Sequence, residues 1–141
     1  MNRRLLLRSA FCLGLPALGT TTRAQENRIP LSKLELMFSE MRRNTKWNVD
    51  GPLLWGYFFV DSSRARLSNL AERLQADGYK LVELRPAVDS TIMHQLHVER
   101  IETPTPESLH ARNAQLYSLV AELGVASYDG MDVGPVNAAT R

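Results

Sequence analysis

Residues 53–60 read LLWGYFFV, an apolar, aromatic-rich run that lies between Pro52 and Asp61. A run of this length with such flanks favours a strand over a helix, and its continuous apolar character is typical of a central strand covered on both faces. Trp55 and Tyr57 would share one face of this strand. They are large amphipathic side chains of the kind that anchor protein interfaces, although burial under a preceding helix explains them equally well.

Helices and strands alternate on both sides of this run. The pattern predicts helices within 32–44, 62–77 and 106–123, and strands at 79–85, 91–102 and 125–133. The helix starts are a capping box at Ser32, a polar cap at Asp61 to Ser63, and Thr105 followed by a proline. After the first helix the order is therefore strand, helix, strand, strand, helix, strand.

This order predicts an α+β fold, a ferredoxin-like βαββαβ sandwich with an additional N-terminal helix. In such an arrangement both helices pack on one face of an antiparallel sheet, which leaves the second face open. The first helix, a partner protein or a second copy of the chain could each cover that face. A homodimer through the open face is thus compatible with the sequence.

The first 24 residues, MNRRLLLRSAFCLGLPALGTTTRA, have the pattern of a removable export signal. Arg3 and Arg4 lie in a basic start. The uncharged stretch that follows is shorter than the roughly 18 residues expected of a membrane span. Ala24 ends a small-residue cleavage site. The adjacent arginines resemble a twin-arginine signal, and a general secretion signal is the alternative. We expect residues 1–24 to be removed and the protein to be periplasmic or secreted, without a stable membrane anchor.

Removal of this segment changes the composition of the working protein. Four of the 17 basic residues and none of the 15 acidic residues lie in residues 1–24, so 13 bases and 15 acids remain, a net charge of −2. Nucleic-acid binding needs clustered positive charge, and we do not expect it here. The single cysteine, Cys12, is also lost, which excludes thiol chemistry. Residues 25–134 then predict one domain, followed by a disordered tail at 135–141.

His97 and Glu99 are the residues that best fit a functional polar patch. Both would lie on the same face of the strand at 91–102, and on the open side of the sheet, although an ordinary solvated face is the more common explanation. His94 would point to the opposite face, so the two histidines cannot share a metal ion without a bulge. The sequence therefore predicts no metal site here.

The stretch around Gly130 carries the other candidates. Asp129 and Asp132 lack the repeated oxygen ligands of a cation loop, and a glycine that relieves a bulge or bend explains the stretch better. Tyr128 could either pack or present its hydroxyl. No nucleophile elbow, phosphate loop or zinc-ligand spacing occurs in the sequence, so we predict no catalytic residue and no cofactor.

Two segments carry a resemblance to a known family. Residues 67–74 lead into DGYKLVE at 77–83, and LGVASYDG occupies 123–130. With these segments, residues 47–133 resemble regulator of ribonuclease activity B, the bacterial ribonuclease E inhibitor family. The resemblance implies a small domain without a cofactor that regulates by binding another protein. The chain departs from the family in its small net charge, in its non-acidic tail, and in Met131, where the family tends to have tryptophan.

We therefore expect an exported, non-catalytic domain that binds a protein partner. The family's ribonuclease cannot be that partner, because an exported protein does not meet a cytoplasmic enzyme, and the sequence does not identify another one. Two alternatives stay open: a cytoplasmic ribonuclease regulator whose start is assigned too early, and a small hydrolase or metal-dependent enzyme that uses His97 and Glu99. The candidate partner-binding residues are Trp55, Tyr57, His97, Glu99, Tyr128 and Asp129.

Overall fold

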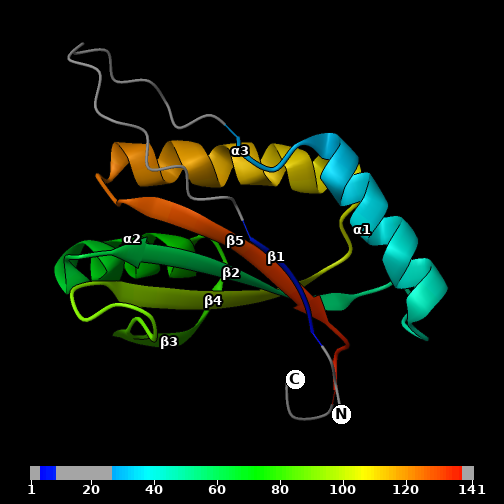
Figure 1. Ribbon diagram of the computed structural model, residues 1–141, viewed down its shortest axis with the longest axis horizontal. Coiled ribbons are helices and arrows are strands. Elements are labelled where there is room, and N and C mark those ends of the chain that lie inside the picture. The colour runs from blue at the N-terminus through cyan, green and yellow to red at the C-terminus, as the bar shows by residue number, and fades with distance from the viewer. Residues whose placement is uncertain (1–3, 9–26, 138–141) are drawn as a thin grey trace.

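The computed structural model describes residues 4–8 and 27–137, which form one antiparallel sheet and three helices (Figure 1). The elements in chain order are β1 Leu5–Arg8, α1 Leu31–Asn44, β2 Leu53–Asp61, α2 Arg64–Ala76, β3 Lys80–Pro86, β4 His94–Glu102, α3 Pro106–Glu122 and β5 Ser127–Gly134. No helix among these residues is long and apolar enough to cross a membrane.

The sheet has the strand order β1-β5-β2-β4-β3, and every neighbouring pair is antiparallel. Without β1, the chain order β2-α2-β3-β4-α3-β5 and the spatial order β5-β2-β4-β3 are those expected for a split βαβ arrangement. The predicted α+β class and the additional N-terminal helix are confirmed. Strand β2, formed by the aromatic run, lies at the centre of this four-stranded part.

Two of the three predicted helix starts are confirmed. The side chain of Ser63 accepts a hydrogen bond from a backbone amide of the first turn of α2, and Thr105 and Ser108 form a reciprocal capping box at α3. The capping box predicted at Ser32 is wrong. Helix α1 begins one residue before it, with Pro30 as the N-cap residue, so the Ser32 side chain already lies inside the helix.

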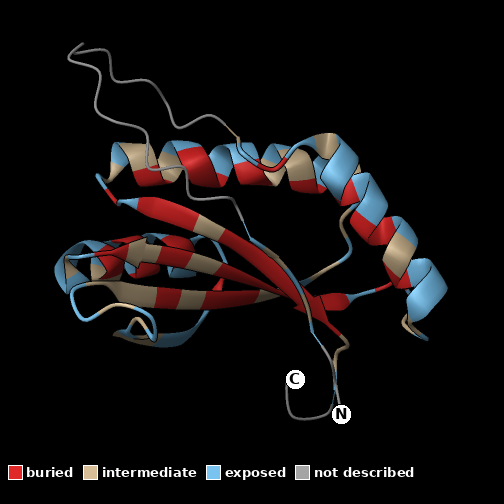
Figure 2. Ribbon diagram, viewed as in Figure 1, coloured by how far each residue is buried: buried red, intermediate tan, exposed pale blue. Residues whose placement is uncertain are grey.

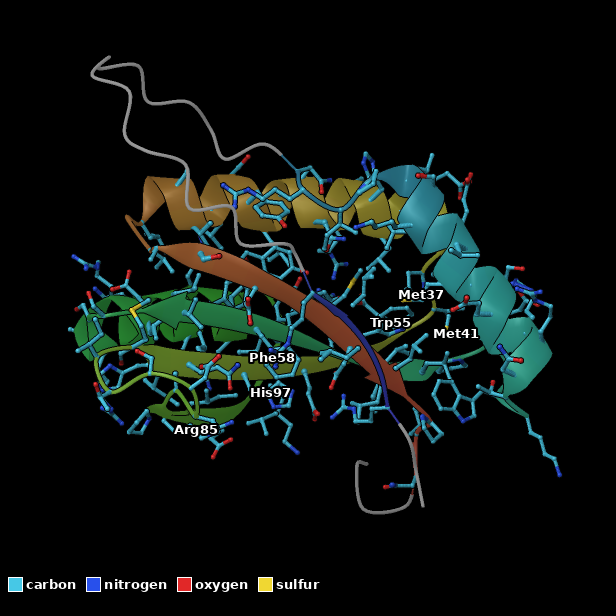
Figure 3. All side chains as sticks on the ribbon, viewed as in Figure 1. Met37, Met41, Trp55, Phe58, Arg85 and His97 are labelled. Carbon is cyan, nitrogen blue, oxygen red and sulfur yellow. The ribbon has the colours of Figure 1, made fainter. Side chains whose placement is uncertain are left out.

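The core lies on one face of the sheet, which all three helices cover (Figure 2). Trp55 and Tyr57 point into this core and are 1% and 0% exposed. Phe38 of α1 stacks on Trp55 with ring centroids 5.8 Å apart, and Tyr117 of α3 packs edge-on against Tyr128. Helix α1 therefore covers the same face as α2 and α3, and Figure 3 shows Trp55 next to its methionines. It does not cover the second face.

The second face of the sheet carries no helix. Its centre is occupied by Phe58 and His97, whose rings stack with centroids 4.4 Å apart (Figure 3). Leu6 on β1 and Ile101 on β4 are 49% and 42% exposed. We call this surface the open face. Its exposed apolar side chains lie among charged ones, such as Arg4 and Glu99.

Gly130 interrupts the regular pairing of β5 with β2, as the sequence predicts. Its φ is +107°, and the register shifts between Phe58 and Phe59, so that Asp129 has no partner position on β2. This is a β-bulge, in which one strand has an extra residue. A side chain at Gly130 would strain the backbone, which explains why glycine occupies this position.

Strand β1 is an element that the sequence did not predict. Leu5–Arg8 pairs with β5 from Gly130 to Val133, at the edge of the sheet, and Leu5 and Leu7 pack against the core. These four residues belong to the segment expected to be an export signal. Other parts of that prediction, Arg3, Ala24 and Cys12, lie outside the described residues, as do residues 138–141 of the predicted tail.

Candidate functional site

Arg4 connects two carboxylates on the open face. Its Nη1 donates a hydrogen bond to Glu99 Oε1 at 2.8 Å, and its Nη2 lies 2.7 Å from Asp132 Oδ1. Glu99 lies on β4 and Asp132 on β5, and both pair with Gly56 on the strand between them. The guanidinium therefore spans the central strand. We call Gly56, Glu99 and Asp132 the arginine seat.

Gly56 makes this arrangement possible. A Cβ at this position would lie 2.3 Å from Asp132 Oδ1, 2.8 Å from His97 Nε2 and 3.1 Å from Arg4 Nη2. Gly134 plays a similar part at the end of β5, where a Cβ would lie 3.2 Å from Arg4 Cγ. The two glycines thus leave room for the Arg4 side chain to lie across the open face of the sheet.

The carboxylates of the seat are largely removed from solvent. Glu99 and Asp132 are only 9% and 8% exposed as residues. Burial raises the pKa of Asp132, and Glu99 adds to this effect, while the positive charge of Arg4 opposes it. Arg4 places its guanidinium between the two carboxylates and supplies the positive charge that opposes the raised pKa of Asp132.

His97 borders the seat without completing a catalytic pair. Its Nε2 lies 3.4 Å from Glu99 Oε1 and has no hydrogen-bond partner among the described residues. Burial lowers the pKa of His97, the charge of Glu99 raises it, and Arg4 lowers it again. The sequence prediction that His97 and Glu99 share the open face is confirmed. No group of three or more possible metal ligands occurs in the described parts of the chain.

The other predicted contact residues are distributed differently. Trp55, Tyr57 and Tyr128 have their side chains in the core and do not reach the surface. The hydroxyl of Tyr128 donates to Asn113 Oδ1 at 2.8 Å, so it is turned inward. Their burial agrees with the packing role that the sequence left open for them.

Asp129 lies in the bulge of β5, away from the arginine seat. Burial raises its pKa, which the charge of Arg8 opposes. Together with Arg8 and Arg85 it lines a hollow of about 640 Å³ at the end of the open face. The structure therefore does not bring Asp129 together with Glu99 and His97 in one site.

A second group of charged side chains lies at the other surface, between α2 and α3. Glu102 accepts a hydrogen bond from Tyr57, and Arg112 Nη1 lies 3.0 Å from Glu102 Oε2 and donates to the Tyr79 hydroxyl at 2.9 Å. A hollow of about 570 Å³ opens beside it, lined in part by Arg100 and Arg112. Both arginines lie within 4 Å of Glu102, so their charges are largely balanced there.

Sequence reasoning identified Glu99 and His97 but did not identify Gly56 or Asp132 as parts of a site. A lone glycine inside a strand is the one signal that could have indicated a close approach at position 56. For Asp132, the sequence indicates no role beyond a local turn or a cation loop. Its pairing opposite Gly56 depends on the bulge at Gly130, which shifts the register of β5.

Comparison with known proteins supports one assignment. The family model described as "Regulator of ribonuclease activity B" matches residues 33–133, about 70% of the chain, and these residues include the arginine seat. Searches of curated proteins and of solved structures found no significant match. The chain belongs to the regulator of ribonuclease activity B family.

Proposed function

We propose that this protein is a non-catalytic regulator that acts by binding another protein through the open face of its sheet. The observation that carries the proposal is that α1, α2 and α3 all pack on the other face, so that Phe58, His97 and their charged neighbours face outward. The family is described as a regulator of ribonuclease activity, which supports a binding role. An open sheet face with apolar and charged groups is suited to contact a protein surface.

We further propose that the protein is exported and that residues 1–24 are removed. The basic start, the short uncharged stretch and the small-residue exit support this. In the full chain, Leu5–Arg8 is an edge strand of the sheet, and its removal would uncover β5 and the arginine seat. Export and partner binding would then be connected, because the same cleavage exposes the binding surface.

Cell fractionation and sequencing of the N-terminus of the protein test the export proposal. We expect a periplasmic or secreted form that begins at residue 25. An intact Met1 in the cytoplasm would contradict export and favour the alternative, a cytoplasmic ribonuclease regulator. In that case the full chain should inhibit ribonuclease E in a purified assay.

Affinity capture with matched variants tests the binding surface. We expect a partner that is retained by the wild-type protein and by Arg43→Glu, on α1, but lost with Arg85→Glu, on β3 at the open face. Both substitutions make the same change of charge at partly or fully exposed positions. Equal loss with both variants would contradict the open face as the binding surface.

The hydrolase alternative rests on His97 and Glu99, whose nearest atoms are 3.4 Å apart. The same Glu99 oxygen accepts from Arg4, and the His97 ring is stacked on Phe58, so neither group is positioned for proton transfer to a substrate in the full chain. A turnover activity that His97→Ala abolishes while the fold survives would overturn the non-catalytic proposal.

A further inference from the structure

The β5 edge and the arginine seat together form the site that β1 and Arg4 occupy. Leu5–Arg8 supplies the strand: Leu5 and Leu7 turn toward the core, and Leu6 and Arg8 lie on the open face. The side chain of Arg4, which precedes the strand, reaches across β5 and β2 to Glu99 on β4. Backbone pairing and side-chain recognition are thus both present in one short segment.

The residues of the arginine seat lie within the part of the chain that the family model matches, while Arg4 lies outside it. The family match covers residues 33–133, which include Gly56, Glu99 and Asp132, and β1 lies outside it. Glu99 and Asp132 flank Gly56 from the two adjacent strands, and keeping two nearly buried carboxylates there without a cation would lower the stability of the fold. An arginine, from this chain or from another, would offset that loss of stability.

We propose that the β5 edge and the arginine seat bind an extended segment of a partner protein that carries an arginine, and that β1 occupies this site within the same chain. The inference rests on the proposed protein-binding function and gives the chemistry of the partner. The mode is strand addition, in which main-chain hydrogen bonds hold the segment and side-chain pockets select it. Removal of residues 1–24 would leave the edge unpaired and available for such a segment.

The arrangement of β1 defines the segment that fits. It has an arginine, followed by apolar residues one and three positions later that take the places of Leu5 and Leu7. Arginine suits the seat better than lysine, because its planar guanidinium presents two nitrogens to two separate carboxylates. Arg4 does this with Nη1 and Nη2 at 2.8 and 2.7 Å.

The experiment uses the full chain with its own strand displaced. In the variant Arg4→Met, Leu5→Asp, Leu7→Asp, the seat loses its arginine and two carboxylates replace the leucines that pack on the core. The probe is a synthetic peptide of residues 3–9, RRLLLRS, and a second peptide has methionine in place of its second arginine. Binding is followed by titration and by the amide chemical shifts of β5.

We expect the arginine peptide to bind and to shift the β5 amides from Gly130 to Val133. The methionine peptide should bind more than tenfold more weakly, since it leaves two buried charges without a partner. Adding Glu99→Gln and Asp132→Asn to the protein should weaken the arginine peptide by a similar factor. Adding Glu107→Gln, an exposed acid on α3, should leave its affinity unchanged.

Equal affinity of the two peptides, or no binding to a variant that unfolds cooperatively, would overturn the inference. So would dimerisation of the variant through β5 that excludes the peptide, because the occupant would then be a second copy of the chain. If the triple variant does not fold, hydrogen exchange of the β5 amides from Gly130 to Val133 is compared in the wild-type and Arg4→Met chains. Faster exchange in the variant is expected, and equal protection would overturn the inference, because β1 would then be held at the β5 edge without its arginine. An intact N-terminus in cells would contradict export, and it would leave the peptide result unaffected.

Discussion

Gly56 and Asp132 lie directly opposite each other on β2 and β5, and a Cβ on Gly56 would lie 2.3 Å from the Asp132 carboxylate. Gly56→Ala must therefore displace Asp132, and with it one of the two anchors of Arg4. We expect the free energy of unfolding to fall by about 2 kcal/mol, a typical cost of overpacking. Urea denaturation of the two proteins measures this difference.

A double-mutant cycle is the control for this prediction. Asp132→Ala removes the carboxylate that the new methyl group would meet, so Gly56→Ala should cost less in that background than in the wild-type chain. Additive losses would mean that the two positions do not interact, which would contradict the close approach described for them.

Arg4→Met should change the titration of Asp132. Burial raises the pKa of Asp132 and Glu99 adds to it, while Arg4 opposes both, so the variant should have a still higher pKa at this residue. Because the pKa of Asp132 is higher in the folded than in the unfolded protein, this group stabilises the fold at pH values below 3.8, the pKa of the unfolded chain. This contribution is lost as the pH rises through the folded-state pKa. The variant should therefore lose stability as the pH rises across that window, by about 2 kcal/mol relative to the wild-type chain. Carbon-detected NMR of the carboxyl groups measures the pKa.

Arg8→Met provides the matched control for Arg4→Met. Arg8 lies on the same strand, and its charge opposes the raised pKa of Asp129. The variant should raise the pKa of Asp129 and leave that of Asp132 unchanged. A similar shift at Asp132 from both variants would contradict the specific contact with Arg4.

The sequence was sufficient to predict the order of helices and strands from residue 31 onward. The evidence was local, because caps at Ser63 and Thr105, the glycine at position 78 and the apolar run of β2 each act within a few residues of the chain. The boundaries were less certain. Strand β4 begins at His94 instead of Thr91, since residues 91–93 precede the point at which pairing with β2 starts.

Long-range relationships could not be predicted in the same way. Strand β1 has only four residues, three of them consecutive leucines without alternation, and its pairing with β5 spans most of the chain. The arginine seat depends on three strands and on a shift in register at the bulge. Neither spacing nor composition contains that information, so His97 and Glu99 were identified without the residues that surround them.

Asp61 joins three elements, and its loss should destabilise the fold. Its carboxylate accepts hydrogen bonds from the amides of Ser63 and Ala126 and from the Arg66 side chain, and it is 1% exposed. Burial alone raises the pKa of Asp61, but these hydrogen bonds outweigh it and hold the pKa below 3.8. Its contribution is therefore present above pH 3.8 and is lost as the pH falls through the lowered folded-state value.

Asp61→Asn should lower the free energy of unfolding at pH 7 by about 2 kcal/mol, because hydrogen bonds to a charged group are stronger than those to an amide. The difference from the wild-type protein should shrink as the pH falls below 3.8, which denaturation at several pH values measures. Asp77→Asn is the control, since Asp77 is exposed and lies 4.0 Å from Arg73. It should change stability by about 0.5 kcal/mol or less.

Glu102 contributes to the raised pKa of a buried tyrosine. Burial is the largest cause of the raised pKa of Tyr57, and the charge of Glu102 and its hydrogen bond with the Tyr57 hydroxyl add to it. Glu102→Gln should therefore lower the pKa of Tyr57, while burial keeps it above the ordinary value of 10.0. The loss of the Arg112 ion pair should cost about 2 kcal/mol of stability. Ultraviolet absorbance during alkaline titration measures the first effect and urea denaturation the second.

Glu122→Gln is the matched control for Glu102→Gln, because Glu122 is an exposed acid at the end of α3. Removing a negative charge from the C-terminal end of a helix should not lower stability. It should also leave the tyrosine titration as it is in the wild-type protein. If both variants shifted that titration equally, a change in overall charge would explain the effect, and the direct contact between Glu102 and Tyr57 would not.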